Sequence, residues 1–181
     1  MDIQQTATKN SAGKNEPSDI HVRHFDGPTG KLVISSSNGA VFSVHFVQPG
    51  EKMLPESGDL TPEISACISQ LGEYFRGERT IFDFPYLQSG TVFQQRVWEE
   101  LAKLPFGKTI SYNQLAAKLG DPKVIRAAAS ANGRNKLAIV IPCHRVIGSN
   151  GDLVGYAGGI SNKRWLLQHE AKFVHGVQTL F

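Results

Sequence analysis

The sequence contains few of the features that secreted or membrane proteins need. Its 181 residues include only two cysteines, Cys67 and Cys143, which stand 76 positions apart. No run of about eighteen apolar residues is present, so the sequence predicts no transmembrane helix. Residues 1–19 are polar and lack both the apolar core of a secretory signal and the arginines of a transit peptide, and we interpret them as a disordered tail. We therefore expect a reducing compartment, the cytoplasm or a eukaryotic nucleus, in which both cysteines are free thiols.

No pattern of metal ligands or cofactor-binding residues stands out in the sequence. Zinc sites use cysteines and histidines at short, regular spacings. His21, His24 and His45 have no such spacing to Cys67, which stands beside Ile68 and is expected to be a core residue. We therefore predict that the protein binds neither a metal nor a cofactor.

Charge is unevenly distributed along the chain, although the formal net charge is only +3. Residues 1–95 carry an excess of acidic side chains, whereas residues 96–145 carry nine Lys or Arg against three Asp or Glu. A basic segment of this kind suggests a polyanionic partner, and nucleic acid is the obvious one. A solvated basic face without a ligand explains the charge equally well, so charge alone does not decide the function.

Residues 20–88 predict a small α+β domain. Residues 31–35 and 40–47 are apolar at alternate positions, and Asn38-Gly39 between them is typical of a tight hairpin turn. Thr61-Pro62 is typical of a helix start, and the apolar side chains that follow have helical spacing (Ile64, Ile68, Leu71 and Phe75). We interpret residues 80–87 as a further candidate strand.

Residues 89–175 predict a second, mostly helical domain. A first helix is indicated by apolar side chains at helical spacing (Phe93, Val97, Leu101 and Leu104). Ser111 and Gln114 form a capping box at the start of a short helix that stops at Gly120, and Asp121-Pro122 begins another. Two short helices joined by a tight turn predict a helix-turn-helix. A pair of core helices packed through alanine would show the same pattern.

The most informative stretch is residues 142–146, with the sequence Pro-Cys-His-Arg-Val. It follows an apolar run at residues 137–141, which predicts a short strand. Cys143 is followed by an imidazole and a guanidinium, and such neighbours raise the fraction of reactive thiolate. A buried structural cysteine is the alternative, because free cysteine is among the most buried residue types.

Several motifs occur together in a characteristic order and spacing. They are Tyr112, Arg126, Asn135, the Pro-Cys-His-Arg-Val run, Gly-Tyr-Ala-Gly-Gly at residues 155–159 and Trp-Leu-Leu-Gln-His-Glu at residues 165–170. With them the chain closely resembles the O6-alkylguanine-DNA alkyltransferase family over about residues 20–172. The resemblance implies an α+β fold, in which a ribonuclease-H-like N-terminal domain precedes a mostly helical C-terminal domain with a helix-turn-helix.

The resemblance also implies an activity, the stoichiometric transfer of an alkyl group from O6-alkylguanine in DNA to the protein's own cysteine. O4-alkylthymine is a further candidate substrate. Cys143 is then the alkyl acceptor, His144 takes its proton through a water, and Glu170 orients the imidazole. The water is expected because neighbours on a strand point to opposite faces. Asn135 stiffens the active-site turn, and Tyr112 donates a proton or hydrogen bond to the guanine as charge develops on the leaving group.

The partner implied by the resemblance is double-stranded DNA containing O6-alkylguanine, bound by a monomer. Arg126 enters the base stack and holds the space of a nucleotide flipped out of the duplex. The small side chains that follow Arg126 suit docking that does not depend on sequence. The other residues expected to contact DNA are Lys123, Ala127, Ser130 and Arg134, and those expected to hold the flipped guanine are Val146, Tyr156, Ala157 and Gly158.

The chain departs from the better-known mammalian relatives at two points. Position 157 is alanine where they carry serine, so a side-chain hydroxyl is lost and only the backbone N–H remains. The N-terminal half lacks the cysteines and histidines that hold a structural zinc in those relatives, which agrees with our prediction of no metal. The cysteine-rich regulatory domain of the inducible bacterial type is also missing.

Two other classes of protein compete with this interpretation. A cysteine hydrolase would need a histidine from elsewhere in the fold and an oxyanion hole, whereas here the histidine is the next residue. A non-catalytic protein of the same fold that only binds alkylguanine lesions would lack the acceptor cysteine. The presence of Cys143 argues against the second alternative.

Overall fold

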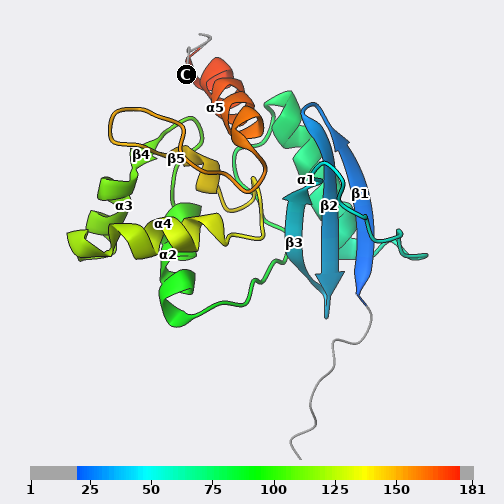
Figure 1. Ribbon diagram of the computed structural model, residues 1–181. Coiled ribbons are helices and arrows are strands. Elements are labelled where there is room, and N and C mark those ends of the chain that lie inside the picture. Colours follow the sequence, from blue (N-terminus) through cyan, green and yellow to red (C-terminus); the bar gives the residue numbers. More distant parts are fainter. Residues whose placement is uncertain (1–19, 176–181) are drawn as a thin grey trace, which may run out of the picture.

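The computed structural model describes residues 20–175, so the predicted disordered tail at residues 1–19 lies outside the described part. The N-terminal half contains a three-stranded antiparallel sheet in the order β1-β2-β3, followed by one long helix. Figure 1 shows this sheet and its helix on one side of the molecule and α2, α3 and α4 on the other. The elements of this half are β1 (His21–Gly27), β2 (Gly30–Ser37), β3 (Ala40–Phe46) and α1 (Pro62–Arg76).

The C-terminal half is mostly helical, as the sequence predicts. Its only sheet in the described part is the short parallel pair β4-β5. No helix within residues 20–175 is long and apolar enough to cross a membrane. The elements are α2 (Val92–Ala102), β4 (Ile110–Ser111), α3 (Tyr112–Lys118), the 3-10 helix η1 (Pro122–Val124), α4 (Ile125–Gly133), the 3-10 helix η2 (Cys143–Arg145), β5 (Val146–Ile147) and α5 (Ile160–His175).

The predicted hairpin is confirmed, because the turn between β2 and β3 is Asn38-Gly39. Both residues have positive φ, 51° for Asn38 and 75° for Gly39. A two-residue hairpin turn of this hand requires positive φ at both positions, and asparagine and glycine tolerate it best. Ser37 pairs with Ala40 directly across the turn, and the buried faces of the two strands meet α1.

The predicted helix starts are also confirmed. Ser111 Oγ accepts a hydrogen bond from the Gln114 backbone N–H (3.1 Å), while Gln114 Oε1 accepts one from the Ser111 N–H (2.7 Å). The Asp121 carboxylate accepts one from the Lys123 N–H (2.8 Å). These contacts satisfy N–H groups that a helix leaves unpaired in its first turn. The turn after Asp121 is the 3-10 helix η1, so α4 itself begins only at Ile125.

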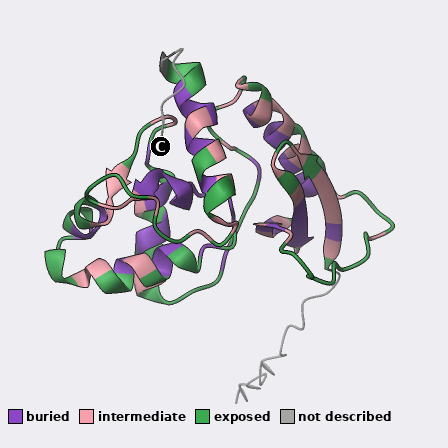
Figure 2. Ribbon diagram, turned by 45° about the horizontal axis from the view of Figure 1, so that its top comes forward, coloured by how far each residue is buried: buried purple, intermediate pink, exposed green. Residues whose placement is uncertain are grey.

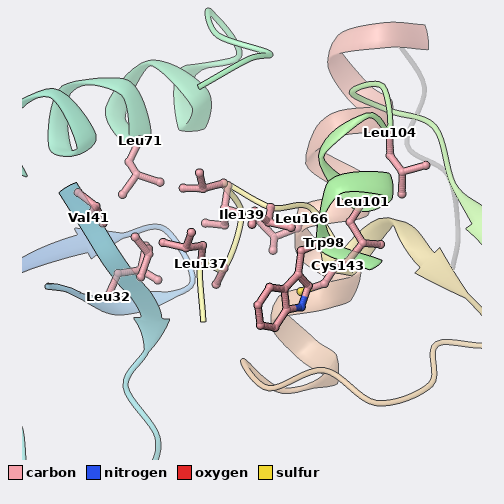
Figure 3. Close-up of a cluster of buried hydrophobic side chains, with 14 of the residues drawn as sticks. Leu32, Val41, Leu71, Trp98, Leu101, Leu104, Leu137, Ile139, Cys143 and Leu166 are labelled. Carbon is pink, nitrogen blue, oxygen red and sulfur yellow. The ribbon is translucent and has the colours of Figure 1, made fainter. Parts of the chain in front are cut away.

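One continuous hydrophobic core joins the two halves of the chain. Figure 2 shows buried residues where the elements face one another and exposed residues on their outer sides. In Figure 3, Leu137 and Ile139 lie between Leu32 and Leu71 of the N-terminal half and Trp98 of α2. The backbone also links the halves, because Val44 of β3 donates to the Lys136 carbonyl (2.7 Å) and accepts from the Ala138 N–H (2.8 Å).

The predicted strand at residues 80–87 is wrong. These residues make only one isolated bridge to β3, between Val41 and Tyr86. Pro85 has no N–H group, so it cannot donate to a longer ladder.

The predicted strand at residues 137–141 is also wrong, because the segment makes one bridge at Leu137 and then turns back. The Asn135 side chain bonds the Leu137 N–H and the carbonyls of Leu137 and Ile141, which a strand would have paired with a neighbouring strand. Ile139 has a φ of 71°, a strained value for a β-branched residue. The apolar run is buried on several sides, and such a run cannot be distinguished from a strand by periodicity.

Candidate active site

Cys143 lies at the start of η2, in the C-terminal half of the chain. It is 4% exposed, and its Sγ accepts a hydrogen bond from Asn135 Nδ2 at 3.1 Å. Burial raises the pKa of the Cys143 thiol, whereas the Asn135 N–H and the nearby Lys163 ammonium favour the thiolate. The fraction of thiolate at Cys143 therefore depends on Asn135 and Lys163, and on any charge that a bound ligand adds.

Cys143 and His144 are not on a strand, which corrects the geometry expected from the sequence. Both lie in the tight turn of η2, and His144 is fully buried. Its Nε2 lies 2.8 Å from Glu170 Oε1, while its Nδ1 is buried with no hydrogen-bond partner among the described residues. Because an ionised carboxylate only accepts, Nε2 carries the proton and Nδ1 is left as an acceptor. Burial is the main cause that lowers the pKa of His144, and Glu170 opposes it.

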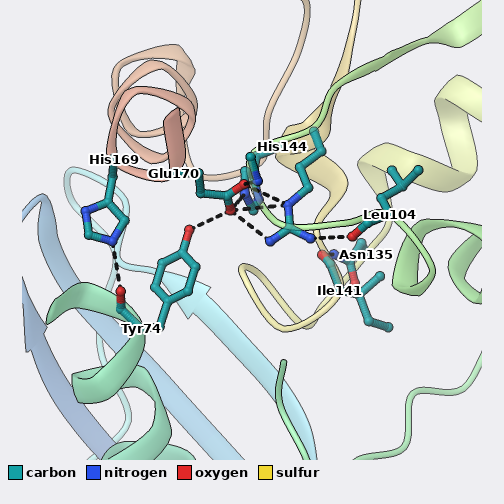
Figure 4. Close-up of polar contacts among 9 residues, drawn as sticks. Tyr74, Leu104, Asn135, Ile141, His144, His169 and Glu170 are labelled. Carbon is teal, nitrogen blue, oxygen red and sulfur yellow. Dashed lines mark hydrogen bonds and ion pairs between the residues drawn. The ribbon is translucent and has the colours of Figure 1, made fainter. Parts of the chain in front are cut away.

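Glu170 is the centre of the polar network and is itself fully buried. Figure 4 shows the side chains of Tyr74 and His144 pointing toward its carboxylate. Burial alone would raise the pKa of Glu170, but His144 and Arg145 hold it well below its ordinary value. The donors are His144 Nε2 (2.8 Å), the Tyr74 hydroxyl (2.9 Å), the Gly107 N–H (2.9 Å), and Arg145 Nε and Nη2 (2.9 Å each).

Asn135 connects the nucleophile to the turn before it. Its Nδ2 lies within hydrogen-bond distance of the Ile141 carbonyl (2.8 Å), the Leu137 carbonyl (3.3 Å) and Cys143 Sγ. Its Oδ1 accepts from the Leu137 N–H (3.0 Å) and from Gln88 Nε2 (3.2 Å). Gln88 also accepts a hydrogen bond from the Lys136 N–H (2.8 Å). The segment that connects the two halves therefore also stabilises the turn.

Tyr112 reaches the same site from the first residue of α3. Asn132 Nδ2 lies 3.5 Å from the Tyr112 hydroxyl and 3.5 Å from the Cys143 carbonyl. Burial raises the pKa of the Tyr112 phenol, and the nearby Cys143 raises it further. Asn132 Oδ1 is buried with no partner among the described residues. The Asn132 amide and the Tyr112 phenol therefore lie near Cys143, and each can form a further hydrogen bond.

The residues expected to form the base pocket lie close to these groups. The Tyr156 ring packs edge-on against Phe46 and His144, with ring centroids 6.3 and 6.4 Å away, and its hydroxyl is buried without a partner in the described part. A side chain at Gly158 would collide with Phe46 and Tyr156, at 2.5 and 2.7 Å. Val146 is buried, whereas Ala157 is exposed.

Lys163 is a site residue that the sequence reasoning missed. It is fully buried, and its ammonium donates to the carbonyls of Val146 (2.7 Å) and Val154 (2.9 Å). Burial lowers the pKa of Lys163 to about 8, although the Cys143 sulfur opposes this shift. Lys163 thus joins the two ends of the loop that precedes Tyr156, Ala157 and Gly158, which are expected to hold the base. Other residues missed are Tyr74, Gln88 and Asn132.

The residues expected to contact DNA form one exposed face. Lys123 belongs to η1, Arg126, Ala127 and Ser130 belong to α4, and Arg134 follows α4 directly; all five are exposed. Their spacing of three or four residues places them on one side of the helix. The opposite side of α4 is buried and includes Ala128, Ala131 and Asn132, so one short helix joins the basic face to the thiol site.

The candidate site contains no cluster of metal ligands. Within residues 20–175, no three His, Cys, Asp or Glu side chains are grouped so that they could hold a metal ion.

Known proteins are similar to this chain in both sequence and fold. Residues 92–172 match the family described as 6-O-methylguanine DNA methyltransferase, DNA binding domain. The chain is 41% identical over 165 residues to the methylated-DNA–protein-cysteine methyltransferase of Mycobacterium bovis, and the match covers 90% of this chain and 99% of that relative. The chain belongs to the methylated-DNA–protein-cysteine methyltransferase family. This confirms the resemblance found in the sequence.

Solved structures of the methyltransferase family agree with this fold. The crystal structure of the Mycobacterium tuberculosis O6-methylguanine methyltransferase superposes with a TM-score of 0.78 at 38% identity, covering 88% of this chain and 97% of that one. A structure of the same organism's enzyme in complex with DNA gives a TM-score of 0.76 at 40% identity, covering 84% of this chain and 94% of that one. The similarity extends over the N-terminal half, beyond the matched DNA-binding region.

Proposed function

We propose that this methyltransferase repairs DNA by moving the alkyl group of O6-alkylguanine onto Cys143, once per molecule. O4-alkylthymine is a further candidate substrate for the same chemistry. The observation that carries the proposal is the array of Asn135, Cys143, His144 and Glu170, with Sγ bonded to Asn135 at 3.1 Å and His144 bonded to Glu170 at 2.8 Å. Family membership supplies the reaction class, and this array supplies the groups that the reaction needs.

The transfer is an in-line displacement at the alkyl carbon. His144 removes the thiol proton through a water bound at Nδ1, and the Cys143 sulfur then forms a bond to the alkyl carbon. The bond from that carbon to O6 breaks, and its electron pair passes to the guanine. Glu170 holds the imidazole in the tautomer that leaves Nδ1 free to accept. The buried Nδ1 of His144, which has no partner within residues 20–175, supports this assignment.

Tyr112 supplies the compensating proton or hydrogen bond. Charge that develops on the leaving guanine is stabilised by a donor already in place, and the Tyr112 phenol stands beside the thiol. The guanine is held by Val146, Tyr156, Ala157 and Gly158. Two observations support such a pocket: the Tyr156 hydroxyl has no partner in the described part of the chain, and Gly158 keeps open the space that a side chain would fill.

The partner is double-stranded DNA, which the protein binds as a monomer through α3 and α4 acting as a helix-turn-helix. Lys123, Ala127, Ser130 and Arg134 contact the duplex, and Arg126 replaces the extruded nucleotide. Two observations support this docking: these side chains are exposed on one face, and the opposite face of α4 contacts the thiol site.

The chain is organised as an N-terminal domain at residues 20–88, of ribonuclease-H-like type, and an alkyl-acceptor domain at residues 89–175. The three-stranded sheet with one helix supports the first assignment. We place the protein in the cytoplasm or nucleus, because both cysteines are free thiols, which persist in a reducing compartment.

Mass spectrometry after mixing with duplex DNA containing O6-methylguanine tests the proposal. The expected result is one methyl group on Cys143 and none on Cys67, whose pKa burial raises to about 12. Cys143→Ser should bind the same DNA without an adduct, and Cys67→Ser should react like the unchanged protein. DNA binding without any adduct on Cys143 would favour a lesion-binding protein instead, and an acyl adduct with ester substrates would favour a hydrolase.

A further inference from the structure

We infer that Tyr74 is a positioning residue for alkyl transfer, through which the N-terminal half of the chain acts on the catalytic histidine. Tyr74 lies on α1, yet its hydroxyl donates to Glu170 Oε1 at 2.9 Å, the oxygen that also bonds His144 at 2.8 Å. Figure 4 shows this hydroxyl pointing from α1 into the carboxylate network. The inference rests on the proposed function, since it assigns a further residue to that same site.

Packing alone does not account for a tyrosine at this position. Its ring lies among the aromatic rings of Phe75, Phe82 and Phe106, with centroids 5.4 to 5.8 Å away, and phenylalanine would fill the same space. A hydroxyl that is fully buried costs free energy unless it is hydrogen-bonded. The hydroxyl therefore serves the carboxylate rather than the core.

Two neighbouring contacts fix Tyr74 against α5. The Tyr74 carbonyl lies 2.8 Å from His169 Nε2, and the Tyr74 hydroxyl bonds Glu170. The same residue thus bonds two consecutive residues of α5 with its backbone and its side chain. A shift of α1 along α5 would break both bonds, so the position of the N-terminal helix is transmitted to Glu170.

The hydroxyl competes with His144 for the charge on Oε1. Hydrogen bonds to a carboxylate strongly affect its charge and its pKa. Without the Tyr74 hydroxyl, more of the Oε1 charge is available to stabilise a protonated His144 imidazole, so the pKa of His144 rises. Tyr74 thereby keeps His144 neutral and able to accept the thiol proton near neutral pH. The other charged or titratable groups that face this pair are Arg145 and Cys143 on η2, Tyr156 on the following loop, and Lys163 and His169 on α5.

The test compares Tyr74→Phe with the unchanged protein from pH 5.5 to 8.5. The single-turnover rate constant for methyl transfer is measured with protein in excess over methylated duplex, and the His144 imidazole is titrated by NMR in the DNA-free protein. We expect the acid limb of the rate profile and the His144 titration to move to higher pH by about half a unit to one unit. Transfer at pH 6 should then slow by about twofold to fivefold, and the two rates should converge above pH 8.

Phe75→Leu is the matched control, because it loosens the same aromatic cluster without removing a bond to Glu170. It should lower the melting temperature and leave both pH profiles in place. An unchanged acid limb and an unchanged His144 titration in Tyr74→Phe would overturn the inference, whatever happens to its stability. Absence of any adduct in the unchanged protein would instead overturn the proposed function, and the NMR titration would still decide the role of Tyr74.

Discussion

Asn135 donates a hydrogen bond to the sulfur of Cys143, and with the same side chain it closes the turn that carries this sulfur. The turn has a strained residue, Ile139, at its centre. One amide therefore determines both the shape of the backbone before the nucleophile and part of the polar environment of the sulfur. The turn depends on Asn135 more than on any pairing with a neighbouring strand.

Asn135→Ala should destabilise the fold and slow methyl transfer. The substitution leaves the Leu137 N–H buried without a partner, which costs about 1–3 kcal/mol. It also removes one of the two hydrogen bonds that the Ile141 carbonyl accepts, the other coming from the Cys143 N–H. We expect the free energy of unfolding in urea to fall by about 2–4 kcal/mol. Lys136→Ala removes only an exposed side chain next to it and should change stability by less than about 0.5 kcal/mol. Equal effects of the two substitutions would contradict the role of Asn135 in the turn.

Arg126→Ala should slow repair in duplex DNA by about tenfold or more and leave reaction with the free alkylguanine base nearly unchanged. Only the duplex imposes an unstacking cost of a few kcal/mol, which an inserted side chain offsets. Single-turnover rates on the two substrates give the comparison. Arg164→Ala, which removes an exposed cation from α5, serves as the control. A uniform loss on both substrates would mean that Arg126 supports the chemistry or the fold.

Binding to undamaged duplex should weaken steeply as salt is added. The logarithm of affinity falls against the logarithm of salt concentration with a slope of about −0.9 for each phosphate contact. Lys123→Ala should reduce the magnitude of that slope by about one contact's share. Lys52→Ala, which removes an exposed charge from the N-terminal half, should leave the slope unchanged. A flat salt response of the unchanged protein would show that the basic face does not bind DNA.

Glu170 should make stability dependent on acid. Its folded-state pKa lies below the unfolded value of about 4.3, so its contribution to stability is complete above that pH and is lost as pH falls toward the folded pKa. Glu170→Gln should lower the free energy of unfolding by about 3–5 kcal/mol at pH 7, because Arg145 and His144 lose a buried partner. Urea unfolding from pH 7 to pH 3 should show this difference shrinking. The exposed Glu99→Gln is the control, and a difference that stayed constant over this range would exclude the ion pairs as its cause.

Alkylation of Cys143 should lower the melting temperature of the protein. The sulfur lies in a close-packed core, where an added group costs about 1–3 kcal/mol. For a chain of this size each kcal/mol corresponds to about 2–4 °C, and bulkier alkyl groups should lower the melting temperature further. Cys143→Ser mixed with the same DNA is the control for DNA binding alone, which raises the melting temperature of a protein that binds the DNA when folded. An unchanged or higher melting temperature of the stoichiometrically alkylated protein would rule out strain at the sulfur.

The features that the sequence predicted correctly depend on residues close together in the chain. The Asn38-Gly39 turn and the capping box of Ser111 and Gln114 are each closed by contacts within four residues. Local backbone chemistry is enough to predict such elements. Residues 137–141 were misread because their apolar pattern fits a strand, while a side chain outside the run, that of Asn135, sets their conformation.

The missed parts of the site depend on contacts between distant residues. Tyr74 and Glu170 are 96 positions apart, and Gln88 and Asn135 are 47 apart. Tyr74 follows Leu71 at helical spacing, so a core position for it could have been predicted. No residue near Tyr74 in the sequence, however, indicates that Glu170 is its hydrogen-bond partner. Lys163 stands between Asn162 and Arg164, and nothing in such a polar stretch predicts a buried lysine, which is rare in proteins.

The hydrophobic core that the two halves share has a consequence for the supply of active protein. Cys143 belongs to the same apolar cluster as Leu32 of the sheet and Leu71 of α1. The sulfur of Cys143 is therefore not carried on a separate part that could be replaced while the rest of the chain is retained. With one transfer to Cys143 per molecule, as proposed, each lesion removed would consume the whole folded polypeptide, and the number of intact chains would limit how many lesions can be repaired.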